Sequence, residues 1–173
     1  MSETETFRTA APNTPDAAPS SGDPVLTDWA AAGAARALAE FGDPAGHGRA
    51  LAALAAAHAW AAGDGDVDDC RDAAFEAQLA ARDAQDDGYR ALATAYRAAA
   101  NAAASVDDAS LAREAADLAV EAITLNSAPC EQDFASGFER RRQWDELPET
   151  LRPAVFSAEP PEPAPASCAI VVD

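Results

Sequence analysis

Two histidines are the side chains of this chain best suited to bind a transition metal or to move protons near neutral pH. They are His47 and His58, and the sequence has no other histidine. On one helix they would lie on roughly the same side but three turns apart, too far to share a metal ion. No carboxylate-x-x-His pair of the di-iron type accompanies either residue. We therefore predict no metal site, and we expect His58 to be a partly buried residue that is hydrogen-bonded within the fold.

The segment from Asp64 to Asp68 begins like a calcium-binding loop, in which alternate residues supply oxygen ligands. Such a loop also needs glycine at its sixth position and a bidentate glutamate at its twelfth. Those positions hold Asp69 and Phe75, so the match fails. We expect the segment to cap a helix and to form an acidic surface turn instead. Its candidate contacts for a protein partner are Asp64, Asp66, Asp68 and Asp69.

The sequence has no pattern for nucleophilic catalysis or for phosphate binding. There is no Gly-x-Ser-x-Gly elbow, and the glycine-rich segment 42–48 lacks the lysine of a P-loop and the preceding strand of a dinucleotide-binding turn. The three cysteines, Cys70, Cys130 and Cys168, form no Cys-x-x-Cys pair and are odd in number, which implies no disulfide framework. We predict a protein that is not an enzyme and needs no cofactor.

The one basic cluster of the chain consists of Arg140, Arg141 and Arg142. In one interpretation these arginines lie on an exposed helix and pair with nearby carboxylates, namely those of Glu139, Asp145 and Glu146. In the other interpretation they form a contact patch for an acidic partner or a second subunit. Both interpretations stay open at this point, and the three arginines join the candidate partner contacts.

Net charge limits the classes of partner. The chain has 30 acidic and 12 basic residues, a net charge of −18, and no lysine. Such a surface repels nucleic-acid phosphates and anionic lipids, so we expect neither nucleic-acid nor membrane binding. The charge is explained by adaptation to a salt-rich, halophilic cytoplasm, by a basic partner, or by the bias of high-GC coding. We favour salt adaptation together with coding bias.

A cytoplasmic location is expected from the start of the chain and from its hydropathy. The first residues are acidic and polar, unlike a signal peptide, and no apolar run is long enough to span a membrane. Residues 1–22 read as a disordered acidic leader, 23–153 as a helical domain, and 154–173 as a proline-rich flexible tail.

Alanine dominates the central part of the chain, and it is the best helix former although it adds little area to a core. Hydrophobic residues reach 49% of the chain, whereas aromatic residues make up 6%. This composition predicts an all-α fold, an antiparallel helical bundle or αα-hairpin array of five to six helices. Caps, glycine stops and apolar spacings place the helices at about residues 24–41, 45–62, 67–86, 88–104, 109–125 and 131–146, followed by a short turn.

Bulky residues are expected to mark the inner faces of these helices. Trp29, Leu38 and Phe41 should point toward the core, and Leu51 and Leu54 share one face of the second helix. In the third helix, Phe75 and Leu79 form an apolar pair four residues apart, and the stem of Arg82 could lie across the edge of the core beside them.

The stretch from Arg49 to Ala84 resembles a family of small helical immunity proteins of polymorphic toxin systems. The resemblance rests on Trp60 and Gly63 at the end of one helix, an acidic turn, and then Arg71-x-Ala-Ala-Phe75-x-Ala followed by Ala80-Ala81-Arg82. Trp144, Leu147-Pro148 and Leu151-Arg152 resemble the C-terminal element of the family. Together these segments span roughly residues 25 to 153. The resemblance implies a helical protein that binds another protein.

Three functional hypotheses follow, of which the least favoured is the third, an enzyme or metal protein whose site the sequence does not show. The first is a non-enzymatic protein that resembles toxin-immunity proteins and occludes a protein partner, with its acidic surface matching a basic toxin such as a nuclease. The second is a helical scaffold or homo-oligomer without a toxin partner, with the helix of the three arginines as its interface.

Overall fold

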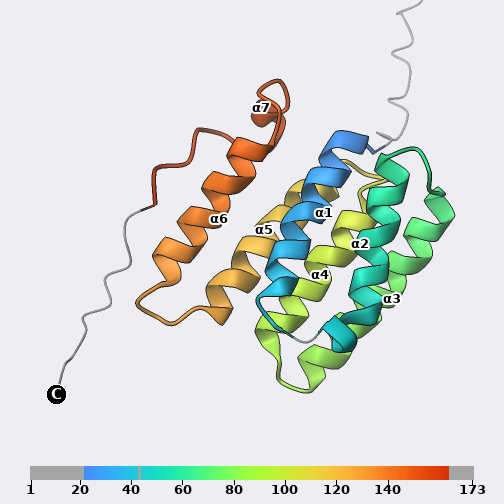
Figure 1. Cartoon of the computed structure of the whole chain (residues 1–173), viewed down its shortest axis with the longest axis horizontal. Coiled ribbons are helices and arrows are strands. Elements are labelled where there is room, and N and C mark those ends of the chain that lie inside the picture. Colours follow the sequence, from blue (N-terminus) through green and yellow to red (C-terminus); the bar gives the residue numbers. More distant parts are fainter. Residues whose placement is uncertain (1–21, 43, 164–173) are drawn as a thin grey trace, which may run out of the picture.

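The computed structural model describes residues 22–42 and 44–163, and this part of the chain contains helices and no strand (Figure 1). The predicted all-α fold is confirmed. In chain order the helices are α1 (Pro24–Ala39), the 3₁₀ helix η1 (Pro44–His47), α2 (Gly48–Ala61), α3 (Val67–Asp86), α4 (Arg90–Ala104), α5 (Ser110–Asn126), α6 (Gln132–Glu146) and α7 (Arg152–Val155). The six long helices agree with the predicted ranges to within a few residues, and α7 is the expected short turn.

Helices α1 to α5 form the main bundle. Helix α4 lies at its centre and packs against α1, α2, α3 and α5. Helix α6 lies outside this group, against α5 and α1, and α7 follows beyond its end (Figure 1). The bundle therefore has α3 on one flank and α6 on the other.

Most buried hydrophobic residues are alanines, and many of them, such as Ala34 and Ala99, are wholly inaccessible to solvent. Small side chains let helices approach closely, although each removes little apolar area from water. The bulkier buried residues are few: Leu26, Trp29, Leu38, Leu54, Tyr96, Val106, Leu147 and Val155. The expected inward positions of Trp29, Leu38 and Leu54 are confirmed, and Phe41 is half-buried against this core.

Other bulky residues lie outside, contrary to expectation. Leu51 is 40% exposed and Phe75 is 63% exposed. The physical reason is which face of each helix meets the bundle: the buried positions of α2 and α3 are mainly alanines, such as Ala53 and Ala77, and Leu51 and Phe75 lie outside those faces.

The helix ends follow local rules. Asp23 Oδ1 accepts a hydrogen bond from the Val25 backbone N–H at 2.8 Å, and Asp66 caps α3 in the same way through the N–H of Asp68. Gly63 ends the α2 segment with a φ of 83°, a left-handed conformation that favours glycine. Gly65 is needed for space, because a Cβ there would lie 2.6 Å from the backbone nitrogen of Trp60.

Some predictions fall on residues outside the described ranges. These are the leader, apart from Gly22, the part of the tail after residue 163, and Cys168. Among the described cysteines, Cys70 is a buried free thiol, whereas Cys130 is disulfide-bonded, a bridge that the number and spacing of the cysteines did not predict. An odd number of cysteines is compatible with one bridge and one leftover thiol.

Within the described ranges no helix is both long and apolar enough to cross a membrane.

Candidate partner-binding surface

Helix α6 presents a polar face to the bundle. Its buried residues are Glu139 and Gln143, which are 4% and 1% exposed. The side-chain amide of Gln143 donates to the Ala116 carbonyl at 3.0 Å, and the Trp29 indole N–H donates to the Gln143 carbonyl at 2.8 Å. These bonds tie α6 to α5 and α1 in one register, because a shift along either helix would leave buried polar groups without partners.

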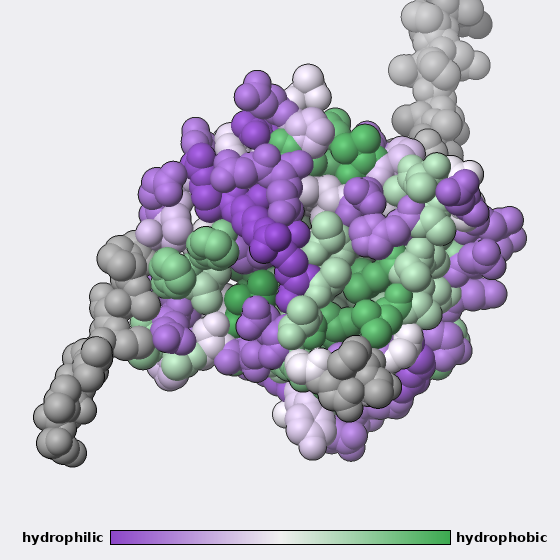
Figure 2. All heavy atoms as spheres, in the orientation of Figure 1, coloured by the Kyte–Doolittle hydropathy of each residue, from purple (hydrophilic) through white to green (hydrophobic). Residues whose placement is uncertain are grey.

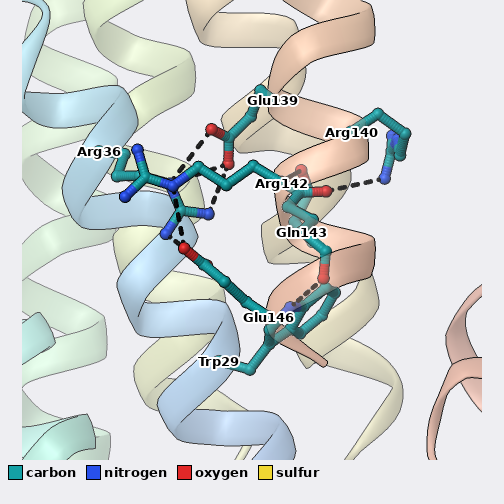
Figure 3. Close-up of polar contacts among 8 residues, drawn as sticks. Trp29, Arg36, Glu139, Arg140, Arg142, Gln143 and Glu146 are labelled. Carbon is teal, nitrogen blue, oxygen red and sulfur yellow. Dashed lines mark hydrogen bonds and ion pairs between the residues drawn. The ribbon is translucent and has the colours of Figure 1, made fainter. Parts of the chain in front are cut away.

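A charged network joins α1 to the same face of α6 (Figure 3). The guanidinium of Arg36 donates to both carboxylate oxygens of Glu139, with Nη2 to Oε1 at 2.7 Å, and its Nη1 lies 2.8 Å from Oε2 of Glu146. Burial lowers the pKa of Arg36, but the hydrogen bonds and charges of Glu139 and Glu146 outweigh this effect and raise that pKa above its ordinary value. Arg36 is therefore a permanent cation on α1 that pairs with two carboxylates of α6.

The three candidate arginines are bonded within the chain. Arg140 Nη2 lies 2.7 Å from Asp117 on α5, Arg141 bonds to Asp145, and Arg142 Nε donates to Glu146 at 2.9 Å. The interpretation that they pair with nearby carboxylates is confirmed for Asp145 and Glu146, whereas Glu139 pairs with Arg36 instead. Their use as a contact patch stays a prediction.

Arg141 also holds the segment that follows α7. Its Nη1 donates to Oε1 of Glu159 at 2.7 Å, and this bond is the main reason that the pKa of Arg141 is raised. Close by, a Cβ at Gly137 would lie 3.2 Å from the Cβ of Pro163. The described part of the tail therefore lies against α6 and covers one side of the arginine cluster.

The other side of α6 is open. Phe134 and Phe138 are 37% and 53% exposed, and their rings stack with centroids 5.8 Å apart. They line a groove of about 560 Å³ between α1, α5 and α6, with Ala39 and Ile123 on the opposite walls. Figure 2 shows hydrophobic areas that interrupt the hydrophilic surface between α6 and the neighbouring helices.

The rim of this groove is acidic. Glu40 at the end of α1 and Glu131 at the start of α6 line it, and in the described part of the chain neither carboxylate has an ion pair or a hydrogen bond. The groove is also lined by Arg36, Glu139 and Arg142, but these three side chains already form ion pairs within the chain. The free charge at the groove is thus negative, beside an exposed aromatic pair.

The four candidate aspartates lie at the opposite flank of the bundle, around the turn between α2 and α3 (Figure 1). Asp66 is the α3 cap, Asp68 accepts a hydrogen bond from Arg71, and Asp64 and Asp69 have no side-chain partner among the described residues. The predicted cap and acidic turn are confirmed. The structure does not bring these aspartates together with the three arginines.

Arg71 pairs with two of the carboxylates near this turn, those of Asp68 and Asp107. It donates to both oxygens of Asp107, at 2.9 and 2.7 Å, and these hydrogen bonds lower the pKa of Asp107 below 3.8. Burial, assisted by nearby carboxylates, raises the pKa of the Cys70 thiol. A raised pKa favours the protonated thiol, which is a weaker nucleophile than the thiolate. The use of the four aspartates as partner contacts stays a prediction.

Neither histidine is placed for metal binding. His47 Nδ1 lies 2.8 Å from the Tyr96 hydroxyl in the bundle interior, and His58 Nδ1 lies 2.7 Å from Asp28 on the surface. The hydrogen bond expected for His58 is confirmed. No group of three or more histidine, cysteine or acidic residues in the described ranges is arranged to hold a metal ion.

A family model described as Imm-5 like putative immunity protein matches residues 23–150, which span the whole bundle and α6. The chain belongs to this family. The resemblance seen in the sequence is therefore confirmed, and the protein is of the immunity type, a class that acts on a protein partner in general. No curated protein and no solved structure gives a significant match to the chain.

In this immunity-type protein the open groove is a feature that sequence reasoning did not identify. The sixth helix carries charged residues on most of its circumference, so no apolar stripe marks which side faces the bundle. A signal was present in the spacing. Phe134 and Phe138 are four residues apart, as are Glu139 and Gln143, and the two pairs occupy adjoining faces.

Proposed function

We propose that this protein is a non-enzymatic, cytoplasmic immunity protein that binds and occludes a basic protein toxin such as a nuclease. The proposed binding surface is the groove between α1, α5 and α6. The observation that carries the proposal is the exposed stack of Phe134 and Phe138 beside a rim whose free charges are carboxylates. Family membership supports a protein partner, and the groove supplies a surface on which to bind it.

The two parts of this surface have different tasks. Aromatic side chains bury much apolar area at little cost in conformational entropy, and they are enriched among the residues that dominate binding energies. Unpaired carboxylates at a rim attract cationic surfaces and orient them, which raises the rate of association more than the final affinity. The phenylalanine pair is therefore the proposed anchor, and Glu40 and Glu131 orient the partner.

High salt separates these contributions. Ions screen the attraction between the rim and a basic partner, whereas burial of the phenylalanine pair is not weakened by salt. A complex that forms in a salt-rich cytoplasm must then depend mainly on the apolar anchor. The candidate contacts at Arg140, Arg141 and Arg142 border this surface on α6 but are already occupied by carboxylates of the chain itself.

The test combines capture with neutralisation. Tagged protein is used to capture partners from its native cytoplasm in high salt, and a stoichiometric basic protein is then expressed in a test host with and without the immunity protein. We expect growth arrest by the captured protein and rescue by the wild type. The double variant Phe134→Ser/Phe138→Ser should lose both capture and rescue, whereas Leu51→Ser, a matched exposed apolar site on α2, should retain both.

Two outcomes would contradict the proposal. Capture and rescue that survive the double variant would place the contact surface elsewhere. Recovery of the bait alone, as a defined oligomer in analytical ultracentrifugation, would favour the scaffold hypothesis.

A further inference from the structure

Most arginines of this protein are neutralised by carboxylates of the same chain, as a net charge of −18 would lead one to expect. In the part of the chain that the structure describes, three arginines have no ion pair: Arg82, Arg97 and Arg113. With acidic residues so abundant, arginines without a carboxylate partner are unusual.

Two of these three arginines line one pocket. Arg82 on α3 and Arg97 on α4 both border a depression of about 460 Å³ between the two helices. Arg113 lies on α5 and is not part of the pocket. Asp86 also lines the pocket, but no ion pair joins it to either arginine. The pocket is thus lined by two arginines, and neither of them is paired with a carboxylate of the described chain.

The guanidinium of Arg97 has unused hydrogen-bonding capacity. Its Nη2 donates to the Thr94 hydroxyl at 2.9 Å, while its Nε is buried without an acceptor. Arg82 is an exposed residue with no hydrogen bond among the described residues. An arginine fork matches the geometry of a carboxylate, which can accept from two N–H groups at once.

The same pocket has an apolar wall. Phe75 is 63% exposed, and Leu79 lies one turn further along the same face of α3. Arg82 is three residues beyond Leu79, so an apolar surface and a cation stand side by side on one helix. A half-open pocket of this size that combines apolar residues with a few polar groups is typical of a binding site.

We infer that this pocket between α3 and α4 is a second binding site, which accepts an acidic side chain next to an apolar residue on a protein partner. The arginine pair binds the carboxylate and the Phe75–Leu79 wall binds the apolar neighbour. Charge complementarity favours this ligand. The acidic surface repels anions over most of the molecule, whereas the arginine pair attracts a carboxylate.

The inference goes beyond the proposed function. The pocket lies on the α3 flank and the acidic groove lies on the α6 flank, at opposite sides of the bundle (Figure 1). The two surfaces also have opposite chemistry, since one attracts cations and the other attracts an anion. A test of the pocket can therefore fail or succeed independently of the toxin proposal.

Two blocked dipeptides serve as probes: N-acetyl-leucyl-glutamic acid amide and its glutamine counterpart. Each is titrated to millimolar concentration into the full-length, ¹⁵N-labelled protein at constant salt, and amide shifts are followed by NMR. We expect the glutamic acid peptide to shift resonances around Phe75, Arg82 and Arg97, with an affinity at least about threefold higher than that of the glutamine peptide. The overall negative charge opposes the charged peptide, so a preference for it must come from the pocket.

Variants locate the effect. Arg82→Gln, at an exposed position, should abolish the preference for the charged peptide, and Arg113→Gln should leave it intact as the matched control. Asp86→Asn should strengthen binding of the charged peptide, because it removes a like charge from the pocket. Phe75→Ala should weaken both peptides equally. Equal binding of the two peptides, absence of binding, or a preference that survives Arg82→Gln would overturn the inference.

Discussion

At the scale of the residue, the pair formed by Arg36 and Glu139 decides how α6 is attached. The side chain of Glu139 is 5% exposed and that of Arg36 is 17% exposed, so both charges are largely removed from water. A buried carboxylate is tolerated here because several N–H groups donate to it. Loss of Arg36 would leave Glu139 buried without a cation, and loss of Glu139 would leave Arg36 with Glu146 as its remaining carboxylate partner.

We expect Glu139→Ala to lower the free energy of unfolding by about 2 kcal/mol, less than the full cost of breaking a buried pair from one side, because Arg36 keeps its ion pair with Glu146. Urea unfolding at constant high salt measures this. The matched control is Arg49→Ala, which removes an exposed pair with Asp83 and should cost less than about 1 kcal/mol. The double variant Arg36→Met/Glu139→Leu should recover most of the loss, because no unpaired charge remains. A cost for Glu139→Ala as small as that of the control would contradict this account.

At the scale of the element, Gly33 and Gly65 differ in whether the surrounding structure leaves room for a side chain. Gly33 lies inside α1, and a Cβ there would meet its nearest atom, Nε2 of Gln143, at an ordinary contact distance of 3.6 Å. Gly65, between α2 and α3, leaves no such room, since a Cβ would collide with the backbone of Ala59 and Trp60. The same substitution should therefore have opposite signs at the two sites.

Gly33→Ala should stabilise the protein by about 0.5–1 kcal/mol, because alanine loses less backbone entropy on forming a helix. Gly65→Ala should destabilise it by more than Gly63→Ala, whose cost of about 1 kcal/mol comes from the left-handed backbone alone and not from a collision. Thermal unfolding of the three variants at one salt concentration gives the order. If Gly65→Ala lowered the stability no more than Gly63→Ala does, the close contact of Gly65 with the backbone of Ala59 and Trp60 would not be a constraint on the α2–α3 turn.

At the scale of the whole molecule, negative charge opposes an alanine core of limited strength. Each buried alanine removes little apolar surface from water, so this core has little reserve against repulsion among 30 acidic residues. Salt at molar concentration reduces the Debye length to about 3 Å and so suppresses most of that repulsion.

The protein should lose helicity as salt falls below roughly molar concentration at neutral pH, measured by far-UV circular dichroism. Acidification in low salt toward the sequence pI of about 4.2 should restore helicity, because protonation of carboxylates removes the same repulsion. Full helicity in dilute neutral buffer would count against salt adaptation and would favour the acidic charge as a surface for a basic partner.

Much of the fold could be predicted because it depends on short-range rules. Asp23 and Asp66 mark helix starts through bonds to N–H groups two or three residues away, and Gly63 marks a helix end through its own backbone angle. The site could be predicted only in part. Arg142 pairs with Glu146 one turn along its helix, as spacing indicates, whereas Arg36 and Glu139 meet from 103 residues apart.

The sequence by itself determined the all-helical class, the helix boundaries and the acidic character, since propensity, capping and charge act within a few residues. Only the tertiary structure decided that Phe75, Phe134 and Phe138 lie outside and that Glu139 and Gln143 lie inside. The physical reason is that burial depends on which faces of the helices meet. Alanines occupy most of the contact positions among helices α1 to α5, whereas α6 meets the bundle through Glu139 and Gln143 and leaves its aromatic pair exposed.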